Sequence, residues 1–195
     1  MGTSVSQGSP RAGPGSTNWA AVAAGYINES VSVDRLVREL WRAAQSGEQS
    51  NWRTLLKAPG VTFFLDAATL ADTPEQAVND ATRSVVRSRQ SSLATDVAKR
   101  ALVQGFLTSD DPRRGFAEAL FCEVTTYLVS RDLPGYVGNR FRNRRVSDAI
   151  GFKNQIRGRV QQEVAGLIED RGLPETGDET SWNLFVDAAV TRLSG

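Results

Sequence analysis

Apolar side chains recur at helical spacing along most of this chain, and this periodicity constrains the fold more than any other feature. In the clearest stretch, the spacing i, i+3, i+4, i+7, i+8 and i+11 places six apolar residues on one face of a helix: Val33, Leu36, Val37, Leu40, Trp41 and Ala44. The same spacing returns later in Trp182, Phe185, Val186, Ala189, Val190 and Leu193. Alternating strand patterns are missing, so the sequence predicts an all-α fold.

Capping and breaking residues divide this pattern into about six or seven helices joined by short connections. Thr73 at an N-cap with Pro74 behind it is a good helix start, and Gly172 with Pro174 is a good helix end. Further helices are expected after Ser32, around Trp52–Lys57, from Ser92, from Asp110-Asp111-Pro112, over roughly Val146–Arg171 and after Asp178-Glu179-Thr180. Residues 61–65 (VTFFL) fit either a short strand or a buried helical turn. We expect the tryptophans to anchor the core.

The first 17 residues, MGTSVSQGSPRAGPGST, are dominated by glycine, serine, threonine and proline. Such a stretch buries too little apolar surface to offset the entropy of ordering, so we expect a disordered tail over 1–17 and one helical domain over 18–195. No apolar run approaches the roughly 20 residues that cross a bilayer, and no apolar signal segment opens the chain. We therefore expect a cytoplasmic protein without membrane contact.

The composition excludes several kinds of chemistry. The chain contains no histidine and a single cysteine, Cys122. This removes Ser-His and Cys-His pairs, CxxC redox centres, and zinc sites built from histidine or thiolates. No glycine-rich phosphate loop is present either. We expect no metal site, no cofactor and no catalytic activity.

One helix carries polar groups among apolar neighbours. Glu118, Cys122 and Glu123 lie in the strongly apolar stretch that follows Pro112. A desolvated glutamate at such a place can act as an acid or base. The alternative, which we favour, is that Cys122 fills the core and Glu123 lies on a solvent-exposed flank.

Residues 138–159, GNRFRNRRVSDAIGFKNQIRGR, form a basic segment. Asp148 is its only acid, which leaves a local excess of six positive charges on Arg140, Arg142, Arg144, Arg145, Lys153, Arg157 and Arg159. Phe141 and Phe152 interleave with these residues, as in surfaces that bind RNA or single strands. The alternative is charge pairing within the protein or between subunits. Residues 160–195 offer partners, with seven acidic residues against two arginines.

The N-terminus carries a signature of its own. Removal of Met1 would expose the amine of Gly2 on an open tail, and Met1-Gly2-x-x-x-Ser6 also fits the N-myristoylation pattern. Met1-Gly2-Thr3-Ser4, the glycines and prolines between residues 8 and 15, and an aromatic start at Trp19 together resemble the N-termini of QatB-like proteins. These are small components of bacterial Qat antiphage defence systems, whose operons also encode a QueC-like enzyme.

The resemblance implies a non-catalytic defence component that acts through contacts with other subunits. It also implies that a QueC-like partner joins the Gly2 amine to a deazaguanine. The residues themselves leave a second function open, which is nucleic-acid binding by the arginine-rich segment 140–159.

Overall fold

A computed structural model describes residues 32–46, 51–88, 92–132 and 146–195, and all regular structure in these ranges is helical. The helices are α2 (Val33–Ser46), α3 (Asn51–Leu56), α4 (Pro59–Leu70), α5 (Pro74–Ser88), α6 (Ser92–Thr108), α7 (Pro112–Asp132), α9 (Val146–Arg171) and α10 (Glu179–Ser194). The predicted all-α fold class is confirmed. The predicted tail, 1–17, and the expected start of the domain at residue 18 lie outside the described residues.

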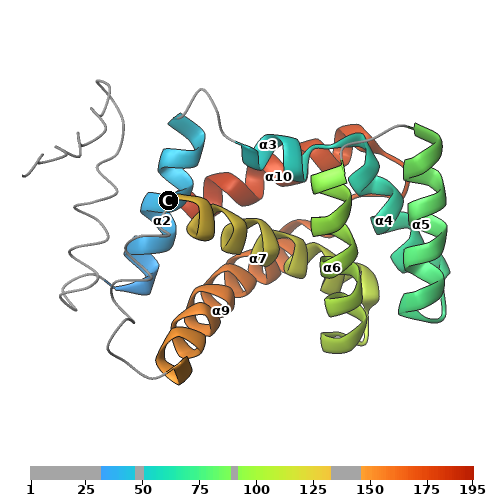
Figure 1. Cartoon of the computed structure of the whole chain (residues 1–195). Coiled ribbons are helices and arrows are strands. Elements are labelled where there is room, and N and C mark those ends of the chain that lie inside the picture. The colour runs from blue at the N-terminus through green and yellow to red at the C-terminus, as the bar shows by residue number, and fades with distance from the viewer. Residues whose placement is uncertain (1–31, 47–50, 89–91, 133–145) are drawn as a thin grey trace, which may run out of the picture.

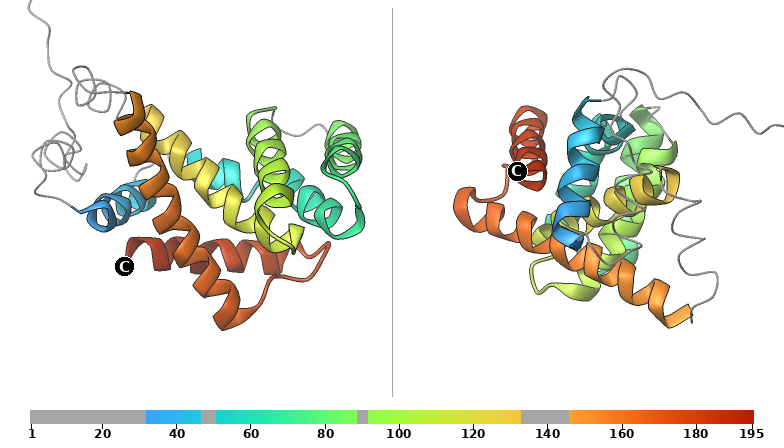
Figure 2. Two further views of the ribbon diagram at one scale, coloured as in Figure 1. Left: turned by 90° about the horizontal axis from the view of Figure 1, so that it is seen from below. Right: turned by 90° about the vertical axis from the view of Figure 1, so that its left-hand side faces the viewer.

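Helix α7 lies at the centre of the domain and contacts α3, α4, α6 and α9 (Figure 1). Helix α5 lies at one end and α2 at the other, and α9 crosses α10 obliquely rather than running parallel to it (Figure 2). Helix α10 also contacts α2, so the last helix packs beside the first described one. None of the described helices is both long and apolar enough to span a membrane.

A chain of aromatic rings runs through the core and joins helices that are distant in the sequence. Trp41 lies 6.2 Å from Trp52 and 6.3 Å from Phe121, measured between ring centroids. Phe121 in turn lies 6.3 Å from Phe185, which stacks on Trp182 at 5.7 Å. Edge-to-face and stacked contacts at such separations add to the free energy gained by burial. Trp41, Trp52 and Trp182 are therefore core anchors, as predicted, and the fourth tryptophan, Trp19, lies outside the described residues.

Side chains cap several of the described helices, among them the predicted N-cap Thr73. Thr73 Oγ1 accepts a hydrogen bond from the Gln76 backbone N–H at 3.2 Å, and Asp111 Oδ1 accepts one from the Arg113 N–H at 3.0 Å. Asp178 caps α10 through the backbone N–H groups of Thr180 and Ser181. At the other end of α9, Gly172 adopts a φ of 76°, a left-handed conformation that glycine reaches without strain.

Helix α4 resolves the alternative that the sequence left open for residues 61–65, because all five residues are helical. Val61, Phe64 and Leu65 are buried, and so are Ala67 and Ala68 one turn later. A helix buried on most of its circumference lacks the polar stripe that reveals helical periodicity. This helix makes eight in the described residues, where we expected six or seven.

Helices α6 and α7 approach each other closely near the turn that joins them, and two glycines make this contact. A Cβ atom on Gly105 would lie 2.5 Å from the backbone nitrogen of Phe116. A Cβ atom on Gly115 would lie 2.5 Å from the carbonyl oxygen of Gly105. Both distances are shorter than van der Waals contact, so this crossing requires glycine at both positions.

Candidate functional site

The structure describes the second part of the basic segment, which lies on α9. Lys153, Arg157 and Arg159 are on this helix, with Arg157 and Arg159 about one-third exposed or less. The remaining predicted site residues lie outside the described residues: Gly2, Arg140, Arg142, Arg144 and Arg145. The structure therefore describes three of the seven cations that we expected to form a binding surface.

Arg157 is held by a carboxylate of the central helix. Its Nη1 donates to Glu123 Oε1 at 2.7 Å, and Arg100 Nε on α6 lies 3.4 Å from the other carboxylate oxygen. The Glu123 side chain is only 16% exposed. We expected Glu123 on a solvent-exposed flank, but the structure places it between two guanidinium groups. A largely buried carboxylate needs such compensation, because desolvating an unpaired charge is costly.

Arg159 lies on a different side of α9, because residues two apart on a helix do not share a face. Its Nε lies 3.0 Å from Asp34 of α2, and its Nη2 lies 2.5 Å from Glu163, one turn further along α9. Charge pairing within the protein thus occupies both described arginines. Of their three acidic partners, only Glu163 belongs to residues 160–195, the stretch that we expected to pair with the basic segment.

Glu118 is the most buried carboxylate among the described residues, with 7% of its surface exposed. Arg114 Nε donates to Oε1 at 2.8 Å, and the Gln161 side-chain amide donates to Oε2 at 2.9 Å. The hydrogen bonds that Arg114 donates to Glu118 and to Glu169 raise the pKa of its guanidinium. The i, i+4 spacing of Arg114 and Glu118 is visible in the sequence. The contact with Gln161 on α9 is not visible in the sequence, because Gln161 lies 43 positions from Glu118.

Cys122 faces the core next to this ion-pair network. Its Sγ lies 3.4 Å from the Arg157 carbonyl oxygen, and the residue is 3% exposed. Burial raises the pKa of the thiol to about 12. The reactive thiolate form is therefore scarce at neutral pH, as is typical of a structural cysteine. The interpretation of Cys122 as core filler is confirmed.

No group of three or more Cys, Asp or Glu side chains in the described ranges is arranged to hold a metal ion. Comparisons with protein-family models, with curated proteins and with solved structures found no match. The function therefore has to be inferred from the residues of this chain. They place one ion-pair cluster, Arg100–Glu123–Arg157, at the junction of α6, α7 and α9.

Proposed function

We propose that this chain is a non-catalytic helical component of a bacterial antiphage defence system, and that a QueC-like partner modifies its Gly2 amine. The observation that carries the proposal is the N-terminal pattern, Met1-Gly2-Thr3-Ser4 followed by a stretch rich in glycine and proline. A modifying enzyme that acts on an α-amine needs an unhindered residue at the chain end, and glycine is the least hindered of all.

The chemistry of the helical domain supports the non-catalytic part of the proposal. Glu118, which could serve as an acid or base, and the neighbouring Cys122 each have a structural role in the fold. Glu118 neutralises Arg114 and orders Gln161. Cys122 is a buried thiol with a raised pKa. A general acid or base must reach the proton that it transfers, and a carboxylate engaged on both oxygens in the interior does not.

Intact mass spectrometry of the protein, purified after expression of its own operon, tests the modification. We expect loss of Met1 and a single adduct on the Gly2 amine. In Gly2→Lys, Met1 is retained because the initiator is removed only before a small residue, so no adduct should form. Gly8→Lys is the matched control, since it alters the same stretch and leaves Gly2 intact. An unmodified Gly2 in the operon-expressed protein would refute the modification.

A phage-infection assay tests the non-catalytic role. Glu118→Gln keeps the shape of the side chain, and Cys122→Ala removes the thiol. Both variants should protect cells as well as the original chain does, provided that circular dichroism shows them folded. Loss of protection in a folded variant would contradict the proposed role.

Nucleic-acid binding by residues 140–159 is the second candidate. It is favoured by Lys153, an exposed cation on α9 that has no carboxylate within ion-pair distance among the described residues. Pairing of Arg157 and Arg159 with acids weighs against it. Binding to duplex and single-stranded DNA and to RNA should fall steeply with salt, and in the triple variant Arg142→Ala, Arg144→Ala, Arg145→Ala. Absent or salt-insensitive binding would remove this candidate.

A further inference from the structure

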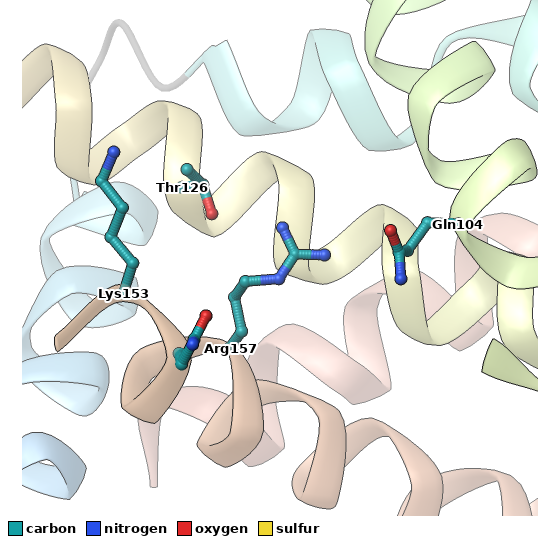
Figure 3. A pocket seen from close by; sticks show the side chains of 5 residues that line it. Gln104, Thr126, Lys153 and Arg157 are labelled. Carbon is teal, nitrogen blue, oxygen red and sulfur yellow. The ribbon is translucent and has the colours of Figure 1, made fainter. Parts of the chain in front are cut away.

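A cavity opens beside the Arg100–Glu123–Arg157 cluster, where α6, α7 and α9 meet (Figure 3). Its volume is about 490 Å³, within the range typical of pockets for small molecules. Five polar residues from the three helices line it: Gln104, Thr126, Lys153, Asn154 and Arg157. Lys153 and Arg157 extend from α9 toward α7, and Gln104 reaches in from α6 (Figure 3).

The charge around the cavity is positive. Arg100 and Arg157 share the single carboxylate of Glu123, and Lys153 has no carboxylate within ion-pair distance in the described parts of the chain. Three cations therefore surround one anion, which leaves a formal excess of two positive charges. A phosphate monoester carries a charge between about −1.5 and −2 at neutral pH. A phosphate group bound here would balance that excess.

Arg157 is already oriented for such a ligand. Glu123 holds one guanidinium nitrogen at 2.7 Å, while the side chain remains 30% exposed on the side of the cavity. An arginine fixed by a buried carboxylate loses less conformational entropy on binding than a free one. The remaining N–H groups of its planar guanidinium can donate to two oxygens of a phosphate at once.

The other lining groups suit the non-phosphate part of a small molecule. The Thr126 hydroxyl donates to the Cys122 carbonyl at 2.8 Å, so its free lone pairs can accept hydrogen bonds from a ligand. The amide groups of Gln104 and Asn154 both donate and accept. This combination fits hydroxyl or amine groups next to a phosphate, and the volume is larger than inorganic phosphate needs.

From these observations we infer that the cavity is a binding site for a small phosphorylated metabolite, with Lys153 and Arg157 on its phosphate group. Its ligand class is a phosphate monoester that carries further hydroxyl or amine groups, such as a nucleotide or a sugar phosphate. This site is independent of Gly2, and therefore of the proposed modification.

Isothermal titration calorimetry with the full chain tests the inference. The phosphorylated probes are AMP and glucose 6-phosphate, and adenosine and glucose are their uncharged controls. We expect saturable binding of at least one phosphorylated probe and none of its unphosphorylated partner. Lys153→Ala should weaken that binding about tenfold or more, because a charge-assisted hydrogen bond is lost. Lys153→Arg should restore part of it.

Lys99→Ala is the matched control, because it removes the same charge from α6 outside the cavity lining. It should leave the affinity unchanged. Arg157→Lys keeps a cation near Glu123 and should weaken binding while the thermal unfolding midpoint stays close to that of the original chain. Three results would each overturn the inference: no binding of either phosphorylated probe, equal losses in Lys99→Ala and Lys153→Ala, or Lys153-dependent binding of an oligonucleotide only.

Discussion

Replacing Gly105 by alanine is the sharpest test of how α6 and α7 pack. A Cβ atom at this position would lie 2.5 Å from Phe116 N, 2.7 Å from Gly115 C and 2.9 Å from Phe116 Cα. Carbon atoms in contact normally lie about 3.5–4.0 Å apart, so the added methyl group is roughly 1 Å too close. All three obstructing atoms belong to the backbone. Relief therefore requires the two helices to separate, rather than a side chain to rotate.

The magnitude follows from two opposing effects. Overpacking in a well-packed core destabilises proteins by about 1–3 kcal/mol and sometimes more, and a clash with the backbone belongs at the upper end. Alanine in place of glycine within a helix stabilises the helix by about 1 kcal/mol through its higher helix propensity. We expect Gly105→Ala to lower the free energy of unfolding by about 2 kcal/mol or more.

Gly158 on α9 provides a matched control for the same substitution. A Cβ atom there would meet nothing within 4 Å, so only the gain in helix propensity remains. Gly158→Ala should raise the free energy of unfolding by about 1 kcal/mol. The two variants should thus differ by roughly 3 kcal/mol in urea denaturation followed by circular dichroism. Equal stability of the two variants would refute the close α6–α7 crossing.

Three other predictions concern the buried thiol, the α10 cap and a third glycine. Cys122 should react with iodoacetamide far more slowly in the folded chain than in urea. A fast reaction of the folded chain with iodoacetamide would contradict the burial of Cys122. Because the pKa of this thiol is 9.0 in the unfolded chain and about 12 in the folded one, the free energy of unfolding should fall as the pH rises from 9.0 toward 12. The Ser181 side chain and backbone amides lower the pKa of Asp178 below 3.8, so its cap should stabilise the fold fully above pH 3.8 and weaken as the pH falls through the lowered pKa. Asp178→Ala should lower the thermal unfolding midpoint and remove the part of the stability that is lost at low pH. If the stability of this variant depends on pH in the same way as that of the original chain, the cap is contradicted. Gly166→Ala should destabilise much less than Gly105→Ala in the same urea assay, because the nearest obstructing atom, at 2.6 Å, ends the flexible side chain of Arg192; an equal loss would contradict this difference.

Helix positions were predictable from the sequence wherever local chemistry determines them. Thr73, Asp111 and Asp178 mark helix starts because their side-chain oxygens accept from backbone N–H groups two or three residues later, and this preference is local. Helix α9 begins at Val146 and ends at Arg171, as expected. Helix α4 was ambiguous because its burial leaves no polar face to set a period.

The contacts that build the candidate site were not predictable in the same way. Arg157 stands out in the sequence as one member of a basic segment, which suggests an exposed surface. Its partner Glu123 lies 34 positions earlier, and only the packing of α9 against α7 brings the two together. Likewise, nothing near Gly105 in the sequence indicates that the backbone of Phe116 will lie against it.

Contacts that span most of the sequence join α10 to the first described helices. Trp182 Nε1 donates to the Leu56 carbonyl at 2.7 Å across 126 positions of sequence, and Arg42 Nε donates to the Ser194 carbonyl across 152. Contacts of such long range form late, since the intervening chain must be ordered first. Until α10 packs onto the other helices, the face of Phe121 that Phe185 covers remains open to water. The core is therefore complete only once α10 has packed against helices that lie more than 100 positions earlier in the sequence.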